Sequence, residues 1–260
     1  MTMMNSISTI TVIGAGRVGS ALARRFRAVG MEVVEVYSRT AQRAARLAEA
    51  TGAQPLTHLK RLAPADLYLI AVPDDAIAGT ARRLRTVLPA AARVVHCSGA
   101  TPSAVLTAHF NRGGVFYPLQ SFAPDRPLDW TTLPLCVHAQ DVGTEDALEQ
   151  LARQLSPVVH RVDDEQRAAL HVAAVLVNNF TNYLFRAAED VTAAHGLPFA
   201  ILRPLIEETV ARLGSAPARE LQTGPAIRGD QRTIDRHLAL LAKFPEYQRV
   251  YALLTDQLSS

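Results

Sequence analysis

The amino-acid sequence predicts an α/β fold, in which a doubly wound, mostly parallel sheet is followed by an all-helical C-terminal domain. Two patterns predict it. Over residues 1–160, short apolar runs alternate with amphipathic helical patterns, and most of the runs lack the polar alternation of a half-exposed strand. Beyond Val162 the periodicity is helical and no convincing strand follows. We therefore predict two domains, an α/β domain at 1–160 and a helical domain at 161–260.

The elements follow from these patterns in chain order. The predicted strands are Ile10–Ile13, Val33–Tyr37, Leu67–Val72, Val94–Cys97, Val115–Tyr117, Leu135–His138 and Val158–Arg161. The helices between them are Val18–Val29, Ala41–Ala50, Asp75–Leu88, Ser103–His109, for which Thr101 and Pro102 are the expected N-cap and first residue, and Thr144–Leu155. The C-terminal helices are Asp163–His195, which ends before Gly196, then Pro198–Leu213, Gln231–Ala242 and Pro245–Leu258.

The segment Thr9–Phe26 carries a glycine pattern typical of dinucleotide binding. Gly14, Gly16 and Gly19 match G-x-G-x-x-G between an apolar strand and an amphipathic helix. The first glycine permits a tight turn, the second a close approach to a pyrophosphate, and the third close packing of helix on strand. The helix start attracts the anion. The alternative is a glycine-rich turn without a ligand. The predicted cofactor contacts are Gly14, Ala15, Gly16, Arg17, Val18 and Gly19.

The end of the second strand indicates which nucleotide binds. An NAD site usually has an acidic residue there, which holds the ribose 2′-hydroxyl. This sequence instead has Ser38, Arg39 and Thr40, and Glu35 lies too early, inside the strand. A guanidinium with two hydroxyl groups suits a 2′-phosphate, so the sequence predicts NADP. The alternative for Arg39 is a solvated surface residue.

Polar groups also follow the later strands of the predicted sheet. In such sheets, ligands bind outside the carboxyl ends of the strands. Val72, Pro73 and Ser98 are therefore expected near the ribose and nicotinamide, and Gln120 and Ser121 near a substrate. Ordinary loop chemistry is the alternative for each. Cys97 is expected to be a small buried apolar residue, and His96, next to it, can point into the packing.

The long predicted helix carries a polar stripe. At about 100° per residue, His171, Asn178 and Asn182 lie within roughly 20° of one line, among apolar neighbours. Buried amides without partners cost about 1–3 kcal/mol each, so these side chains need partners. The stripe would line an active-site cleft or form hydrogen bonds between helices.

A glycine-rich segment, Thr223–Asp230, precedes the third C-terminal helix. Its glycines let the backbone approach another group closely. Arg228 would hold a substrate carboxylate with two hydrogen bonds. Asp230 would take part in catalysis or cap the following helix.

Composition excludes several classes of function. The chain has 260 residues, 48% hydrophobic and 20% charged, with a net charge of +3 and no Lys/Arg block, which gives no support for nucleic-acid binding. Two cysteines, Cys97 and Cys136, provide neither a disulfide framework nor a zinc pattern, so no metal site is expected. The first residues do not resemble a signal peptide, and the apolar run Ala168–Leu176 is too short to span a bilayer. A cytoplasmic protein is expected.

Taken together, the motifs resemble a known bacterial family. They are GAGRVG, CSGA, YPLQSF, the helix with His171 and two asparagines, and LQTGPAIRGD. The chain is similar over nearly its whole length to Rossmann-like NADP oxidoreductases with a C-terminal helical domain of unknown function. Their wider relatives are the 6-phosphogluconate dehydrogenases, β-hydroxyacid dehydrogenases, pyrroline-carboxylate reductases and ketopantoate reductases. The resemblance implies an N-terminal NADP domain, a helical domain that often forms a homodimer, and an active site between the two.

One departure from these relatives concerns the proton donor. Many of those dehydrogenases have a lysine on the long helix, which here contains none. His171 occupies a comparable place, and histidine is a chemically reasonable substitute. We therefore expect an NADPH-dependent reductase of a small 2-keto acid or related carbonyl or imine compound. His171 would be the general acid, Asn178 would orient the substrate, and Arg228 would anchor a carboxylate. The alternatives are a non-catalytic NADP(H)-binding or sensing protein and a deazaflavin-dependent NADP reductase.

Overall fold

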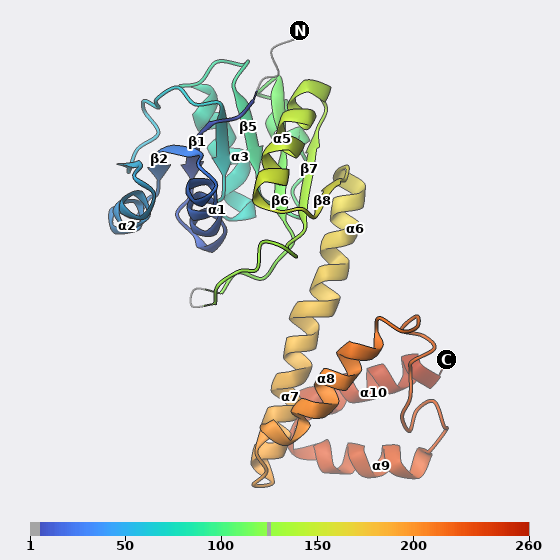
Figure 1. Ribbon diagram of the computed structural model, residues 1–260. Coiled ribbons are helices and arrows are strands. Elements are labelled where there is room, and N and C mark those ends of the chain that lie inside the picture. The colour runs from blue at the N-terminus through green and yellow to red at the C-terminus, as the bar shows by residue number, and fades with distance from the viewer. Residues whose placement is uncertain (1–5, 124–125, 260) are drawn as a thin grey trace. The chain divides into compact units, whose positions relative to one another are not determined.

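The computed structural model describes residues 6–123 and 126–259, and it confirms the predicted α/β sheet followed by a helical region (Figure 1). The start of the chain, where no signal peptide is expected, lies partly outside these ranges, at residues 1–5. The chain divides into two compact units, which meet in the sequence between Leu176 and Val177. The functional division at residue 160 stays a prediction.

The N-terminal unit is built on an eight-stranded sheet with the order β3-β2-β1-β4-β5-β6-β7-β8. The strands are β1 (Thr9–Ile13), β2 (Glu32–Tyr37), β3 (Gln54–Leu56), β4 (Leu67–Ile70), β5 (Arg93–His96), β6 (Arg112–Pro118), β7 (Leu135–Ala139) and β8 (Val159–Arg161). Neighbouring strands pair in parallel, except that β6 and β7 are antiparallel. The strand order reverses between β1 and β4, where ligands bind in doubly wound sheets.

The sheet core explains why the strand sequences are apolar without alternation. Ile10, Leu69, Val95 and Phe116 are fully buried in one core cluster. Ile70 belongs to a second cluster of buried apolar side chains. Helices on both faces of a parallel sheet bury both sides of each strand, which is what the continuous apolar runs predict. The short edge strand β3 was missed, because a three-residue segment that contains proline carries little strand signal.

Six helices of the N-terminal unit follow the predicted pattern closely. They are α1 (Arg17–Ala28), α2 (Ala41–Thr51), α3 (Asp74–Arg85), α4 (Ala104–Thr107), α5 (Val142–Leu155) and α6 (Asp164–Ala174). The predicted capping of α4 by Thr101 is wrong. Ser103 occupies the N-cap position, and its hydroxyl donates to Asp164 of α6 instead of capping its own helix. The cap is replaced by a contact that joins two distant segments.

The long predicted helix is continuous but not uniformly α-helical. Between α6 and α7 (Thr181–Ala194), residues Val175–Phe180 form a π-helix. A capping box of Asp163 and Gln166 starts α6, and Gly196, at φ 71°, follows the end of α7. The wider π turn breaks the regular phase of 100° per residue. The alignment of His171 with Asn178 and Asn182 was predicted from a constant 100° per residue, and that assumption is wrong for residues 175–180.

The helical unit contains the rest of the chain. Its helices after α7 are α8 (Arg203–Arg212), α9 (Gln231–Leu240) and α10 (Pro245–Ser259), with 3₁₀ turns at Phe199–Leu202 and Leu241–Lys243. Its small set of buried apolar residues consists of Ala226, Ile234, Leu241 and Tyr247 among the described residues. Within the described ranges no strand follows β8, and none of the described helices is both long and apolar enough to cross a membrane.

Candidate functional site

The glycine turn after β1 has the geometry of a phosphate-binding loop. Gly14 has φ 121°, and a Cβ there would lie 2.2 Å from the Ala71 carbonyl oxygen. A Cβ on Gly19 would lie 2.0 Å from the Gly14 carbonyl oxygen, whereas one on Gly16 would have no neighbour closer than 4.0 Å. Helix α1 begins with no side-chain cap and no acidic residue in its first turn. Its N–H groups thus remain suited to an anion, and the open side of Gly16 gives that anion room.

The residues at the end of β2 are suited to the 2′-phosphate of NADP. Arg39 and Thr40 are exposed, while Ser38 is buried and its Oγ accepts a 3.2 Å hydrogen bond from the Thr40 N–H. Glu35 is buried inside the strand and accepts a hydrogen bond from the Ala63 N–H at 3.1 Å. Burial raises the pKa of Glu35 despite that bond. No carboxylate therefore stands at the described end of this strand, where it would repel a phosphate.

The loop after β5 is held by its own polar groups. Ser98 Oγ accepts hydrogen bonds from the N–H groups of Ala100 at 3.2 Å and Thr101 at 2.9 Å. The Ser98 N–H in turn donates to Nδ1 of the fully buried His96, and burial together with Arg167 lowers the pKa of His96 to about 4. Burial raises the pKa of the Cys97 thiol, so this cysteine is no thiolate nucleophile at neutral pH. These bonds hold the loop in one conformation at the carboxyl end of β5.

His171 lies against the carboxyl ends of β5 and β6. Its Nδ1 is 3.1 Å from the Tyr117 hydroxyl oxygen, and the two ring planes meet at 72°. A Cβ on Gly99 would lie 2.5 Å from that Nδ1 and 2.9 Å from Cζ of Tyr117. His171, Tyr117 and Gly99 therefore form one packed group, all within the N-terminal unit. The sequence assigned Tyr117 no role, although its position at the end of a strand was a usable signal.

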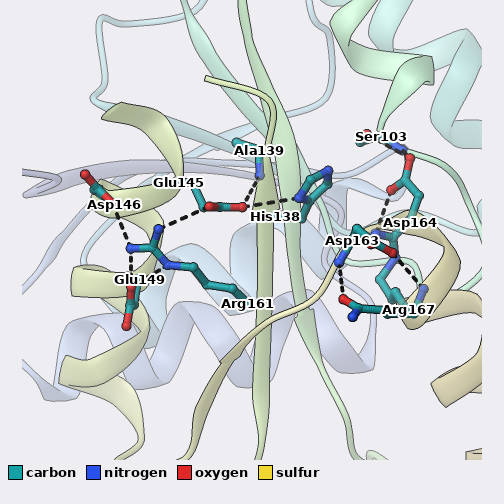
Figure 2. A network of polar contacts seen from close by, with 11 residues as sticks. Ser103, His138, Ala139, Glu145, Asp146, Glu149, Arg161, Asp163, Asp164 and Arg167 are labelled. Atoms are coloured by element: carbon teal, nitrogen blue, oxygen red, sulfur yellow. Dashed lines mark hydrogen bonds and ion pairs between the residues drawn. The ribbon is translucent and has the colours of Figure 1, made fainter. Parts of the chain in front are cut away.

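A partly buried ion pair fixes the start of α6 to the same loop (Figure 2). Asp164 accepts hydrogen bonds from the Ser103 N–H at 2.8 Å and the Ser103 hydroxyl at 2.9 Å. Arg167, only 1% exposed, lies 2.8 Å from Asp164 and donates to the Thr101 carbonyl at 2.6 Å. Although burial opposes ionisation, the contacts with Arg167 and Ser103 hold the pKa of Asp164 below its usual value. These bonds position α6, and therefore His171, beside the loop.

Figure 2 also shows an ion-pair cluster at the other side of β7. Arg161 of β8 contacts Glu145 at 3.2 Å and Asp146 at 2.7 Å, and it forms an ion pair with Glu149. The bond from Arg161 lowers the pKa of Glu149. Arg161 is 43% exposed, and exposed pairs contribute little, so the cluster joins β8 to α5 rather than forming a site.

The remaining predicted site residues lie in loops or in the helical unit. Val72 is partly exposed and Pro73 exposed at the end of β4, and Gln120 is exposed beyond β6, where its side chain accepts a 2.8 Å bond from the exposed Ser121 N–H. Asn178, inside the π-helix, Asn182 and Arg228 are all exposed in the helical unit. Their relation to the cofactor crevice stays a prediction.

The glycine-rich segment before α9 has a structural explanation. Gly224 and Gly229 adopt φ 119° and 65°, and a Cβ on either would meet nothing within 4 Å. The glycines are therefore needed for backbone conformation. Asp230 caps α9, because it accepts hydrogen bonds from the Thr233 N–H at 3.1 Å and hydroxyl at 2.8 Å. The expected capping role of Asp230 is confirmed. Thr223 and Gly224 also border an apolar pocket of about 400 Å³ within the helical unit, between α7 and α10.

Comparisons with known proteins agree with this architecture. Residues 9–98 match the model of a family described as NADP oxidoreductase, coenzyme F420-dependent, and residues 133–258 match a domain of unknown function, DUF2520. No curated protein sequence matches the chain. The crystal structure of a presumed NADP oxidoreductase from Bacteroides fragilis is 35% identical, with a TM-score of 0.89, covering 98% of this chain and 99% of that one.

Two more distant structures share the fold. A protein from Thermotoga maritima is 22% identical, with a TM-score of 0.72 and 96% of each chain covered. A reductive aminase from Aspergillus terreus, in complex with NADPH and ethyl-5-oxohexanoate, is 18% identical, with a TM-score of 0.70, covering 97% of this chain and 93% of that one. The predicted class of oxidoreductase is confirmed at the level of the family. The chain belongs to the family of NADP oxidoreductases in which a Rossmann-type domain precedes a DUF2520 domain.

Proposed function

We propose that this NADP oxidoreductase reduces a small carbonyl or imine compound, with 2-keto acids as the first candidate class. The observation that carries the proposal is the position of His171 at the carboxyl ends of β5 and β6, in contact with Tyr117. In doubly wound folds the reacting end of a bound nucleotide lies along this edge of the sheet. A proton donor at that place is what a carbonyl reduction requires.

The nucleotide would be held by the glycine turn and by the end of β2. Gly16 leaves its backbone open to a pyrophosphate, and Arg39 with Thr40 would bind a 2′-phosphate. Bound NADPH would supply a hydride to the carbonyl carbon. His171 would give a proton to the oxygen, or to the nitrogen of an imine. Val72, Pro73 and Ser98 would border the nicotinamide.

Two of the proposed substrate contacts, Asn178 and Arg228, belong to the helical unit. Asn178 would orient the substrate, and Arg228 would bind a carboxylate with two hydrogen bonds. Both side chains are exposed and therefore accessible to a substrate. The reductive aminase with the same fold binds NADPH and a keto ester, which is why imines and keto esters belong among the candidate substrates.

We also propose a cytoplasmic homodimer built through the helical unit. Large apolar side chains there stay open to solvent in the single chain, among them Val177, Ile201 and Leu205, each more than 60% exposed. Soluble proteins rarely leave so much apolar surface uncovered. A second copy would cover it by a self-complementary contact.

NADPH oxidation by the purified protein tests the function. The panel should contain 2-keto acids, keto esters with and without an amine, and coenzyme F420, because the matched N-terminal family carries that coenzyme in its description. We expect turnover with a keto acid or an imine. Turnover with F420 alone would establish the deazaflavin alternative. Tight NADPH binding without turnover of any compound would instead establish a sensing protein.

Substitution of His171 tests the proton donor. General acid catalysis typically contributes about 10²–10⁴-fold, so His171→Ala should lower kcat in that range while the Kd for NADPH changes little. Asn178→Ala should cost less. Arg228→Ala should mainly raise KM for carboxylate substrates, because the anchor acts in the ground and transition states alike. Full activity of His171→Ala would exclude histidine as the donor.

A further inference from the structure

We propose that Tyr117 is the positioning residue for His171, and that Gly99 is glycine because this pair fills the space beside it. The proposal rests on the proposed role of His171. It assigns a function to a tyrosine that the nucleotide signature and the substrate anchors leave unused. The contact that carries it is the 3.1 Å approach of the Tyr117 hydroxyl oxygen to Nδ1 of His171.

The pair leaves one nitrogen of the imidazole for chemistry. Among the described residues, the hydrogen bond of the His171 ring is made through Nδ1. Nε2 is therefore the nitrogen available to a substrate. In the acid form both nitrogens carry protons, and Nδ1–H donates to the phenol oxygen of Tyr117. When Nε2–H breaks and a substrate O–H bond forms, Nδ1 keeps its proton, so Tyr117 accepts throughout and no proton passes between the two rings.

The surroundings keep Tyr117 a neutral phenol. Burial raises the pKa of Tyr117, Cys136 of β7 and Asp74 of α3 act in the same direction, and Arg167 of α6 opposes them. A neutral phenol accepts a hydrogen bond without forming an ion pair with the imidazolium. It therefore orients the ring and holds the proton that has to leave less strongly than a charged partner would.

Close packing against Gly99 also constrains the two rings, in addition to the hydrogen bond. The Gly99 Cβ position lies 2.5 Å from Nδ1 of His171 and 2.9 Å from Cζ of Tyr117, closer than real Cβ atoms approach. Gly99 has no positive φ, so its backbone alone would accept alanine. A glycine is therefore needed at position 99 because the two rings occupy the space that a Cβ would take.

Tyr117→Phe removes the hydrogen bond and keeps the ring. Because this bond is present before and after the proton leaves, mainly its orienting effect is lost, and kcat should fall about threefold to tenfold. The pH above which activity declines should move lower, since the acceptor for Nδ1–H is gone. The Kd for NADPH should stay within a factor of about two. Wild-type kcat with an unchanged pH profile would overturn the proposal.

Gly99→Ala displaces both rings and deletes neither functional group. It should lower kcat more than Tyr117→Phe does. Gly143→Ala is the matched control, because its Cβ would meet no atom closer than 3.8 Å and should change nothing. Equal activity of the two alanine variants would overturn the steric part of the proposal.

A spectroscopic measurement separates this inference from the proposed function. The ring ¹⁵N signals of His171 in the unliganded protein, assigned by their absence in His171→Ala, report the bond at Nδ1. We expect the Nδ1 signal to move in Tyr117→Phe and the Nε2 signal to move little. If His171→Ala retains activity while this shift is seen, the proton-donor role fails and the pair stands. If the shift is missing, the pair itself fails.

Discussion

The two units of the chain differ in how completely each buries its own apolar side chains. In the N-terminal unit the strands and the inner faces of the helices form continuous buried clusters. In the helical unit Val210 and Leu253 are 61% exposed and Leu205 is 64% exposed, with only a small buried set. One unit therefore buries most of its apolar side chains within a single chain, whereas the other leaves large apolar side chains exposed, which supports the proposed dimer.

The largest effect is expected where the N-terminal unit holds a buried charge. Arg167→Ala removes the buried partner of a partly buried ion pair and leaves Asp164 without it. Removing one partner of a fully buried pair typically costs about 3–5 kcal/mol of unfolding free energy. Because Asp164 is 33% exposed and keeps its bonds from Ser103, we expect the lower end of that range, about 3 kcal/mol. Denaturant unfolding measures the loss. Arg203→Ala, which breaks an exposed pair with Glu207 at 3.7 Å, should cost less than about 1 kcal/mol. Equal losses would mean that burial does not matter here.

The same unit should respond strongly to acid. The pKa of His96 is lowered to about 4 in the folded protein, against about 6.5 when unfolded. The unfolded chain therefore binds the additional proton between these values, and stability present above pH 6.5 is lost as the pH falls towards 4. The unfolding free energy should drop by about 3 kcal/mol in this window. His96→Gln should flatten the profile, while His160→Gln, at an exposed position, should leave it unchanged.

For the helical unit, the sharpest test is a charge on its apolar surface. Leu205→Glu should raise the dimer dissociation constant by at least about 100-fold, because the carboxylate would be buried without a partner. Light scattering over a concentration series gives the value. Val142→Glu is the control, since Val142 is 68% exposed in the N-terminal unit. A wild-type protein that stays monomeric at micromolar concentration would contradict the dimer.

The smallest effect concerns nucleotide choice, which the N-terminal unit should control alone. Arg39→Asp should reduce the preference for NADPH over NADH by roughly tenfold or more, because a carboxylate replaces the cation near the 2′-phosphate. Titration of both nucleotides measures it. Equal affinity for NADPH and NADH in the unmutated protein would show that Arg39 is an ordinary surface residue.

Most of the fold could be predicted because each element carries its own local signal. Buried parallel strands show as apolar runs, and Gly196 marks the end of α7. The π-helix could not be predicted, because the periodicity of residues 175–180 resembles that of an ordinary α-helix. Similarly, the Ser103–Asp164 bond joins positions 61 residues apart, and no local pattern reports such a contact.

The site was predictable where a motif is contiguous and not where it is assembled in space. Gly14, Gly16 and Gly19 lie in one contiguous segment, which covers the turn after β1 and the start of α1, and they can be recognised from spacing alone. The pairing of His171 with Tyr117 joins residues 54 positions apart. Helical periodicity identified His171 as a candidate. Its partner Tyr117 lies on a strand, and only the folded structure brings the two together.

The glycine turn has a consequence for reading a saturation mutagenesis experiment. Replacements at Gly14 and Gly19 collide with backbone oxygens at 2.2 and 2.0 Å, so such variants would be depleted from the pool of folded protein before any ligand is offered. Replacements at Gly16, with free space to 4.0 Å, would remain abundant and fail only at nucleotide capture. Variants of the three glycines would thus fall into two classes. Those at Gly14 and Gly19 would lose folded protein, and only those at Gly16 would report on nucleotide binding.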